Sequence, residues 1–332
     1  MLNFCTLFDS NYLSRGLAMH ESLMKYTNNF TLFVFAFDDR CLEILNKLQL
    51  KNVKVISLEE FENEALLSAK KNRTIGEYCW TCTSSTILYV LEKYQLDHCT
   101  YIEADLYFYS DPKVLFDEMG TDSVLITEHR FSPKYIKFIA NGKYCVQYMT
   151  FKNNEKGVTV LKWWVNACIE WCYNKHENGK FGDQKYLDDW TIRFEGVHEL
   201  QNIGGGVAPW NIQQYDIWDK NNRYYGKVKK TGAKFDFIFY HFHGLRFWDN
   251  NRIDLCEYQL LPVHKELIYK PYLRHLDEVK NRLLKIDNTI IVNENYSHRN
   301  NLRTFYRKAR RIIENRYNIF DKNKFMNRIW QN

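Results

Sequence analysis

The segment CTYIEAD, residues 99–105, is a short run rich in strand formers that ends in two acids, Glu103 and Asp105. Side chains at positions i and i+2 point the same way in an ideal strand, and a turn at the strand's end lets both reach one cation. Magnesium and manganese accept one or two protein carboxylates together with phosphate oxygens. The pattern therefore predicts a divalent-metal site. The alternative is a pair of solvated acids at a strand end, because E-x-D on its own is a weak pattern.

Strands and helices alternate along the chain before this segment. The sequence predicts strands at 2–8, 31–37, 53–57 and 99–105, separated by helices at 12–26, 39–50, 59–71 and 77–94. The strand TLFVFAF, residues 31–37, is almost wholly apolar, as in a parallel sheet buried on both faces. This alternation predicts a parallel α/β sheet with crossover helices. Ligands of such sheets bind beyond the carboxyl ends of the strands, which directs attention to Asp9, Asp38 and the Glu103/Asp105 pair.

The later part of the chain is less regular. The sequence predicts strands at 123–129 and 144–151, a helix at 155–173, irregular structure over 179–252, and a helix over 257–284 interrupted near Pro262 and Pro271. We see no internal repeat or low-complexity linker before about residue 287. We therefore expect one domain over residues 1–286, followed by a tail over residues 287–332.

Composition is that of an ordinary globular protein. Hydrophobic residues make up 45% and charged residues 26% of the 332. Aromatic residues are frequent at 16%, which fits either a pocket with aromatic walls or a compositional bias of the genome. The nine cysteines are odd in number and scattered, and the first residues do not resemble a signal peptide. We therefore expect reduced thiols in a cytoplasmic protein.

Charge is concentrated in the tail. Residues 297–332 contain ten Lys/Arg and two Asp/Glu, whereas the whole chain has a net charge of only +6. The rest of the chain is near neutral, which argues against a nucleic-acid-binding core. One face of a predicted tail helix is apolar, with basic residues around it; the apolar residues are Leu302, Phe305, Tyr306, Ala309, Ile312 and Ile313. Such a helix can lie on an anionic membrane surface, or it can pack on the core with a solvated face.

Several ordered motifs resemble those of a known family. They are FDSNYLSRGLAMHESL (8–23), AKKNRTIGEYCWTC (69–82), YIEADLYFYSDP (101–112), FGDQKYLDDW (181–190) and YHFHGLRFW (240–248). Together they resemble bacterial GT-A glycosyltransferases and, more distantly, the glycogenin-like family eight, over about residues 2–248. The resemblance implies a Rossmann-like mixed α/β sheet with flanking helices, followed here by the basic helical tail. It also implies a nucleotide-sugar donor, with a UDP-sugar favoured, and a glycan or lipid-linked glycan acceptor in cell-surface polysaccharide synthesis.

The same resemblance implies a divalent manganese or magnesium cofactor. Glu103 and Asp105 match the metal-binding D-x-D motif, although Glu103 stands where the family usually has aspartate. The late H-x-x-G segment supplies a third ligand in the family. His241 and His243 alternate on the predicted strand, and we favour His243 as the ligand because it directly precedes Gly244.

Donor-binding residues are also implied by the resemblance. They are Phe8, Asp9, Tyr12, Arg15, Arg73, Trp80, Ala104, Gly205 and His241. A guanidinium fork binds phosphate well, which suits Arg15 and Arg73, but either arginine can instead sit on a solvated helix face. Asp9 can equally be a helix N-cap and Tyr12 a core residue. The glycine-rich run at 202–211, which includes Gly205, is an active-site loop or a tight turn.

Asp183 and Gln184, in the segment matching the family's G-D-Q motif, are the predicted catalytic residues. In retaining enzymes of this resemblance such groups lie beside the anomeric carbon, whereas in inverting enzymes a carboxylate serves as general base. The motifs favour retention. The alternative for Asp183 is a helix N-cap.

Two other functions remain open at this point. A catalytically inactive glycan-binding or scaffold protein on the same fold would explain Glu103 in place of aspartate. A sugar nucleotidyltransferase shares the fold type, but its first loop is glycine-rich and basic, whereas residues 9–12 contain no glycine.

Overall fold

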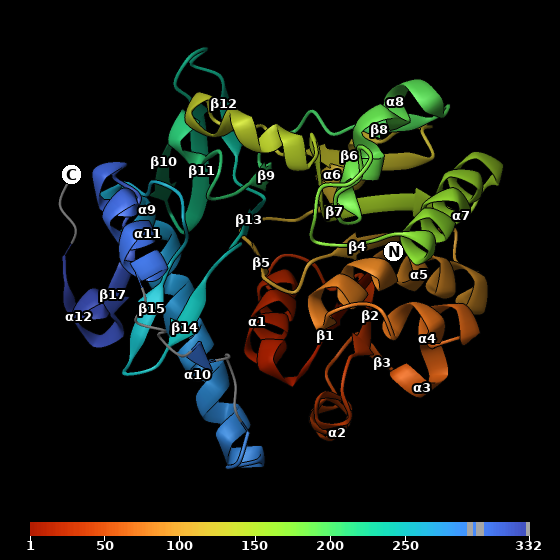
Figure 1. The fold of residues 1–332 in the computed structure, drawn as a ribbon, viewed down its shortest axis with the longest axis horizontal. Helices are drawn as coiled ribbons and strands as arrows, with labels where there is room; N and C mark the ends of the chain where they lie inside the picture. The colour runs from red at the N-terminus through yellow and green to blue at the C-terminus, as the bar shows by residue number, and fades with distance from the viewer. Residues whose placement is uncertain (291–294, 297–301, 330–332) are drawn as a thin grey trace.

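A seven-stranded sheet forms the centre of the molecule (Figure 1). The computed structural model describes residues 1–290, 295–296 and 302–329. The strands lie in the order β3-β2-β1-β4-β7-β6-β8. Their bounds are β1 (Leu2–Phe8), β2 (Phe30–Ala36), β3 (Val53–Ser57), β4 (His98–Ile102), β6 (Val124–Glu128), β7 (Tyr144–Lys152) and β8 (Val197–Glu199). Strands β1 to β4 run parallel, and β7 runs antiparallel to both neighbours, so the sheet is mixed as the resemblance implied.

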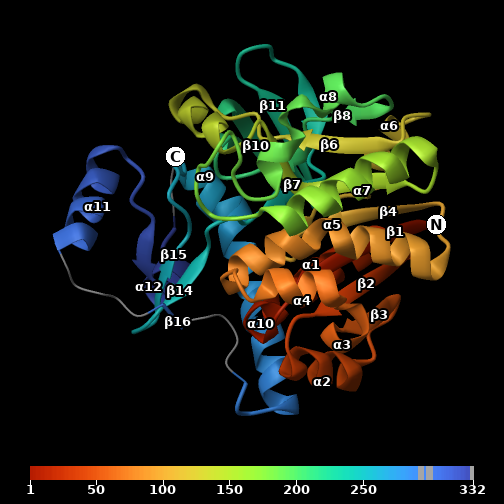
Figure 2. The same ribbon diagram turned by 45° about the vertical axis from the view of Figure 1, so that its right-hand side comes forward.

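Helices cover both faces of this sheet. They are α1 (Leu13–Met24), α2 (Asp39–Leu48), α3 (Leu58–Phe61), α4 (Glu64–Lys70), α5 (Ile75–Tyr94), α6 (Lys113–Glu118), α7 (Glu155–Glu170) and α8 (Trp190–Arg193). Short 3-10 helices occupy Ser10–Tyr12, Pro133–Asn141, Gln184–Asp189 and Ile212–Gln214. Figure 2 shows α5 and α7 side by side over the sheet. The predicted helix over 59–71 is two helices, α3 and α4.

Side chains of β1 and β2 alternate between two hydrophobic cores. Phe4 and Val34 belong to the core that includes α1 and α2, whereas Cys5 and Phe35 belong to the core that includes α5 and α7. Because both faces are buried, both strands are mostly apolar, as their sequences predicted. Asp38 caps α2 by accepting a hydrogen bond from the backbone of Cys41 at 2.6 Å, so its position after β2 has a structural explanation.

The stretch predicted to be irregular, 179–252, contains many short strands, and the prediction was wrong there. Its strands are β9 (Gly205–Val207), β10 (Tyr215–Lys220), β11 (Arg223–Val228), β12 (Lys234–Asp236), β13 (Phe239–His241) and β14 (Arg246–Trp248), followed by β15 (Arg252–Asp254). Strand β13 lies between β9 and β5 (Leu106–Phe108) in a separate three-stranded sheet. Most of these strands have three residues, too few to show the alternation by which a strand is recognised in a sequence. β10 and β11 have six residues each, but they are rich in charged residues and only partly buried, so they lack a continuous apolar run.

The carboxyl-terminal part begins with α9 (Pro262–His264), a π-helical turn at Lys265–Tyr269, and α10 (Lys270–Ile286). Pro271 is the second residue of α10 and follows the π-helical turn almost directly, so the regular α-helix is interrupted near Pro271, as the sequence predicted, although the chain stays helical from Pro262 to Ile286. The tail adds β16 (Asn295–Tyr296), α11 (Leu302–Ile313), β17 (Ile319–Asp321) and α12 (Lys322–Asn327).

Strands of the tail extend the sheet formed by β14 and β15. β16 pairs with β14, and β17 pairs with β15, so this region lies together at one side of the molecule (Figures 1 and 2). The predicted basic helix is α11; the apolar face predicted from Leu302 and Phe305 lies outside the described side chains, as do residues 297–301 and 330–332 altogether.

Candidate functional site

Glu103 and Asp105 lie in the turn between β4 and β5, beyond the carboxyl end of β4. Strand β13 pairs antiparallel with β5, and His241 is opposite Leu106, the residue that follows Asp105. The backbone N–H of Phe242 also donates to the Asp105 carbonyl at 3.0 Å. A pairing between segments 135 residues apart therefore brings a histidine beside the two acids.

The three side chains converge on one point. His241 Nε2 lies 2.8 Å from Glu103 Oε2 and 3.1 Å from Asp105 Oδ1. One ligand atom from each residue lies within 4.8 Å of the others. His241 is 2% exposed, Asp105 14% and Glu103 30%, so one side of the group is open. We call these three residues the acid–histidine cluster.

Electrostatics couple the members of this cluster. Burial acts to raise the pKa of Asp105, but the charge of His241, with a smaller contribution from Arg15, outweighs it and lowers the pKa to about 2. Burial acts to lower the pKa of His241, and the carboxylates of Asp105 and Glu103 raise it well above its usual value. Two negative groups therefore share one positive ring, which leaves the cluster with an excess of negative charge.

The donor set fits a divalent cation. His241 Nε2 is buried and makes no hydrogen bond of acceptable geometry, although two carboxylates lie beside it. If an ion were bound, it would take the place of the hydrogen on Nε2, and the carboxylates beside this nitrogen could bind the same ion. Two carboxylate oxygens and one imidazole nitrogen are ligands that a divalent metal accepts in proteins. Within the described part of the chain, this is the group of acids and histidines with the spacing of a metal site.

His243, which we favoured as the third ligand, is not the histidine that meets the acids. Strand β13 ends at His241, so the alternation expected to carry both histidines does not reach residue 243. His243 is exposed, and its ring packs against Trp210, with the centroids 5.4 Å apart. His241, which we had assigned to the donor, lies with the two acids in place of His243, so the geometry favours His241 as the third ligand; that role stays a prediction.

Tyr12 and Arg15, both predicted to bind the donor, lie next to the cluster. The Arg15 guanidinium lies 4.1 Å from the centre of the Tyr12 ring, and Arg15 donates to the Leu245 carbonyl at 2.9 Å. Arg15 is 4% exposed, so the solvated helix face considered for it is excluded. Asp9 accepts from the Tyr12 amide at 3.2 Å and caps the 3-10 helix, as the alternative held. Their predicted contacts with a donor stay predictions.

Asp183 is a buried carboxyl near the cluster. It is 6% exposed, and its side chain makes no capping hydrogen bond, so the N-cap alternative is not realised. Burial, with a further contribution from the charge of Glu103, raises the pKa of Asp183 to about 8. A carboxyl with a raised pKa inside a site can exchange a proton near neutral pH.

Gln184 follows Asp183 in the sequence, and Trp80 lies close to Asp183 in space. Gln184 donates to the Asn141 carbonyl at 3.0 Å and so ties its segment to the chain before β7. The Trp80 ring lies 3.5 Å from where a Cβ on Gly182 would be, which places it against the residue before Asp183. The catalytic role of Gln184 and the donor role of Trp80 stay predictions.

The other expected donor residues are held by internal packing. The Phe8 ring fills the space beside Gly16, and Ala104 is buried in the turn between the two acids. A Cβ on Gly205 would lie 2.5 Å from a methyl group of Leu115, so close packing inside the protein explains this glycine.

Arg73 is committed to the end of α7. It donates to the Tyr173 hydroxyl and, at 3.1 Å, to the Ile169 carbonyl, and its guanidinium lies 4.0 Å from the centre of the Tyr173 ring. These contacts explain Arg73 without a ligand.

Two residues of the site were missed from the sequence. Trp210 packs its ring against both His241 and His243, with centroids 5.3 and 5.4 Å away. Gln147 contacts His241 Nδ1 at 2.8 Å and is fully buried. Its signal was present, because it is the one amide side chain in the apolar strand YCVQYMTF.

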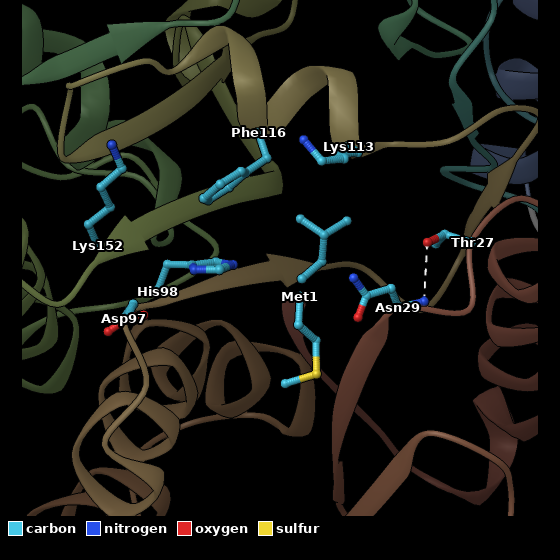
Figure 3. Close-up of a pocket in the computed structure, with 9 residues that line it drawn as sticks. Met1, Thr27, Asn29, Asp97, His98, Lys113, Phe116 and Lys152 are labelled. Atoms are coloured by element: carbon cyan, nitrogen blue, oxygen red, sulfur yellow. Dashed lines mark hydrogen bonds between the residues drawn. The ribbon is translucent and has the colours of Figure 1, made fainter.

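A cavity of about 420 Å³ lies at the other end of the sheet. Figure 3 shows His98, Phe116, Lys113 and Lys152 around it, near Met1. His98 begins β4, whereas Glu103 follows the end of that strand. The cavity is therefore separate from the acid–histidine cluster.

No helix in the described residues is both long enough and apolar enough to cross a membrane.

No protein-family model matches the chain. Two proteins of Bacillus subtilis (strain 168), both described as uncharacterised, are similar to it. YfnD is 30% identical over 288 residues, which cover 84% of this chain and 91% of YfnD. YfnF is 32% identical over 258 residues, which cover 75% of this chain and 84% of YfnF.

Solved structures similar to the chain include two glycosyltransferases. GlyE of Streptococcus pneumoniae TIGR4 matches with 14% identity and a TM-score of 0.40, over 60% of this chain and 45% of GlyE, so the chain spans less than half its length. An active-site mutant of LgtC matches with 12% identity and a TM-score of 0.46, over 85% of this chain and 96% of LgtC. These are enzymes of the kind that the motifs resemble. At such identities and TM-scores the likeness transfers no activity.

Proposed function

The chain belongs to the family of the Bacillus subtilis proteins YfnD and YfnF, and we propose that it is a metal-dependent glycosyltransferase that uses a nucleotide-sugar donor. The observation that carries this proposal is the convergence of Glu103, Asp105 and His241 at the carboxyl end of β4. In the sheet order, β1 lies between β2 and β4, so the ends of β1 and β4 form the switch point where α/β sheets bind ligands.

Glu103, Asp105 and His241 would hold the divalent ion. When bound, the ion supplies charge neutralisation for the diphosphate that leaves the sugar. Arg15, buried beside Asp105, adds a fixed positive charge on the same side. A buried arginine in that place favours an anionic ligand over a neutral one.

We propose that Asp183 binds the hydroxyl group of the acceptor glycan or takes up its proton. Its protonated carboxyl can donate a hydrogen bond to an acceptor oxygen, and its ionised form can accept the hydroxyl proton or stabilise positive charge at the anomeric carbon. The raised pKa of about 8 makes both forms accessible near neutral pH. The motifs favour a reaction that retains the configuration at the anomeric carbon. Determining the anomer of the product would show whether the configuration is retained.

The finer assignments are a UDP-sugar donor, manganese or magnesium as the ion, and a glycan or lipid-linked glycan acceptor in cell-surface polysaccharide synthesis. They are supported by the motif resemblance and by the cluster that fits an ion. We keep a cytoplasmic location, with α11 resting on the inner face of an anionic membrane.

Exposed apolar side chains on α11 support the membrane contact. Tyr306 is 68% exposed, Ile312 53% and Ile313 81%, and Arg307 and Lys308 lie on the same helix. Apolar residues flanked by basic ones bind anionic lipid surfaces. Vesicles rich in phosphatidylserine should sediment the parent protein but not an Ile312→Ser/Ile313→Ser variant. Equal sedimentation of the two would remove the membrane from the proposal.

The test of the enzymatic proposal is donor turnover. With Mn²⁺ and a panel of nucleotide sugars, we expect the release of free nucleoside diphosphate from one donor, and its acceleration by an acceptor glycan. Asp105→Asn should lower the rate at least about 1,000-fold, because removal of a metal ligand costs on the order of 4 kcal/mol of transition-state stabilisation. The matched control is Asp117→Asn, which removes an exposed carboxylate paired with Lys113 and should leave the rate unchanged.

The same assay separates the alternatives. A scaffold protein would bind the donor without releasing diphosphate. A sugar nucleotidyltransferase would instead form pyrophosphate from a nucleoside triphosphate and a sugar phosphate. Either result would overturn the glycosyltransferase proposal.

A further inference from the structure

We propose that Gln147 is a positioning residue that fixes the tautomer of His241 in which Nε2 is free to bind a metal ion. The inference rests on the proposed function, since it concerns the same ion. Gln147 lies on β7, outside every motif by which the family was recognised.

The contact is short and shielded from solvent. Gln147 Oε1 lies 2.8 Å from His241 Nδ1, and the Gln147 side chain has no exposed surface. A carbonyl oxygen only accepts hydrogen bonds, so Nδ1 must carry a hydrogen and donate it. The other ring nitrogen then faces the two carboxylates.

The Gln147 amide is oriented with Oε1 toward Nδ1, which leaves Nε2 on the side of the two carboxylates. An ion held there by Glu103, Asp105 and His241 would bind at Nε2, and Nδ1–H would keep its hydrogen bond to Gln147. If the amide were reversed, its nitrogen would donate to Nδ1, and the hydrogen would remain on Nε2, where it would block the ion.

The backbone of Gln147 holds a second member of the cluster. The Glu103 amide donates to the Gln147 carbonyl at 3.1 Å, one position beyond the last pair of the β4–β7 ladder, Ile102 with Tyr148. One residue of β7 therefore orients His241 with its side chain and Glu103 with its backbone.

A purely structural role does not explain the amide. Gln147 Nε2 is buried and has no hydrogen-bond partner among the described residues. A Cβ on Gly206 would lie only 3.6 Å from this nitrogen, so β9 confines it. An apolar side chain would avoid burying the unpaired Nε2, but it would leave His241 Nδ1–H without its acceptor. Because one unpaired buried group is exchanged for another, we expect Gln147→Leu to be about as stable as the parent protein.

The experiment compares Gln147→Leu with Gln147→Glu. Leucine removes the acceptor, whereas a carboxylate keeps it and restores the carboxylate–histidine–metal arrangement common in metal sites. Mn²⁺ binding is measured by electron paramagnetic resonance of the free ion, without any donor. Loss of a group that orients a metal-bound histidine weakens affinity about 10- to 100-fold. We expect that loss in Gln147→Leu, and an affinity within about threefold of the parent in Gln147→Glu.

Two further readouts distinguish positioning from folding. Thermal unfolding of the metal-free variants should not show a lower Tm for Gln147→Leu. Nitrogen chemical shifts of ¹⁵N-histidine protein loaded with diamagnetic Cd²⁺ should show His241 bound through Nε2 with a protonated Nδ1. Gln201→Leu removes an amide at the exposed residue after Leu200 and serves as the control.

The outcomes separate this inference from the function it rests on. If the parent binds Mn²⁺ and Gln147→Leu binds it equally well, Gln147 does not position His241, and the proposed function stands. If Gln147→Leu and Gln147→Glu are weakened alike, the acceptor is not what matters and the inference fails. If the parent binds no divalent ion, both the inference and the proposed function are overturned.

Discussion

Two groups of buried charge behave in opposite ways. In the acid–histidine cluster, two acids share one imidazole, one side is open, and His241 Nε2 makes no satisfactory hydrogen bond. Between β15 and α11, Asp254 is 1% exposed and Arg311 8%, and two N–H···O bonds of 2.6 and 2.7 Å join them. Arg311 also donates to the Cys256 carbonyl. The second pair is neutral and complete, and it needs nothing from outside the chain.

The pKa directions express the same difference. The charges around Asp105 outweigh its burial and lower its pKa, whereas burial dominates at Asp254 and raises its pKa despite Arg311. Asp254 is therefore buried in the fold at the cost of its hydration, which favours its neutral form. Asp105, in contrast, is kept ionised by the positive charges around it. An ionised carboxylate with unused acceptor capacity is ready for a cation. The fully paired charges of Asp254 and Arg311 therefore belong to the structural scaffold, whereas the incompletely paired charges of the acid–histidine cluster belong to the candidate site.

The largest effect on stability should come from breaking the complete pair. Arg311→Met leaves Asp254 buried without a partner, and such a loss costs about 3–5 kcal/mol of unfolding free energy. Denaturation in urea measures it. The double variant Asp254→Leu/Arg311→Met should recover most of the loss, because no charge remains buried. If Arg311→Met also abolished Mn²⁺ binding, the two groups would not be independent.

How far the sequence predicts the molecule differs between these regions. Strands β1, β2 and β7 were recognised because each is a long, mostly apolar run, β3 and β4 because they are shorter runs of strand-forming residues between helices, and Glu103 and Asp105 were found because they follow β4. The H-x-x-G spacing, counted back from Gly244, already pointed to His241, whereas His243 was preferred because it adjoins Gly244. The structural reason for His241 is a three-residue strand whose partner, β5, lies far away in the sequence. Local pattern does not contain that pairing. The Asp254–Arg311 pair was missed for the same reason.

Local contacts also offer a second explanation for two candidates. Leu115 lies against Gly205 and Tyr173 accepts a hydrogen bond from Arg73, so both residues have structural roles, and their donor-binding roles stay predictions. Gln147 is the opposite case, a residue in an apolar strand whose partner lies 94 positions away. The sequence signal for Gln147 was an amide residue within an otherwise apolar predicted strand, because such a residue is expected to be buried and to need a hydrogen-bond partner.

Mn²⁺ bound by the acid–histidine cluster should raise the free energy of unfolding. At a Mn²⁺ concentration of 100 times Kd, binding to the folded state alone stabilises it by about 2.7 kcal/mol. Urea denaturation with Mn²⁺ or with a chelator measures the difference. We expect the full gain in the parent and in Arg311→Met, and none in Asp105→Asn. A gain of the same size in Asp105→Asn would place the ion elsewhere.

Asp183, which lies near the acid–histidine cluster, should make the free energy of unfolding depend on pH. Its folded pKa of about 8 lies above the ordinary value of about 3.9 for an unfolded aspartate. The stability supplied by the protonated carboxyl is complete below about pH 4 and is lost as the pH rises toward 8. From pH 6 to 7.5 the metal-free parent should therefore lose about 2 kcal/mol that Asp183→Asn does not lose.

Urea denaturation at the two pH values measures this difference. Asp117→Asn is the control, because Asp117 is 54% exposed and pairs with Lys113, so its loss should leave the pH dependence of the parent unchanged. Parallel pH dependences for the parent and Asp183→Asn would mean that Asp183 is ionised in the folded protein, and its proposed role in acceptor binding would lose its support.

The smallest effect should come from Glu103→Asp, which restores the residue usual at this position in the resembling family. Glu103 is 30% exposed and more open than Asp105, so its longer side chain can adjust to an ion. Shortening it by one methylene should weaken Mn²⁺ about fivefold, or about 1 kcal/mol, with transfer still measurable. Calorimetric titration of Mn²⁺ gives the affinity. A loss above about 100-fold would mean that the spacing between Glu103 and His241 is fixed by the fold, and that this cluster is as rigid as the Asp254–Arg311 pair with which it is contrasted.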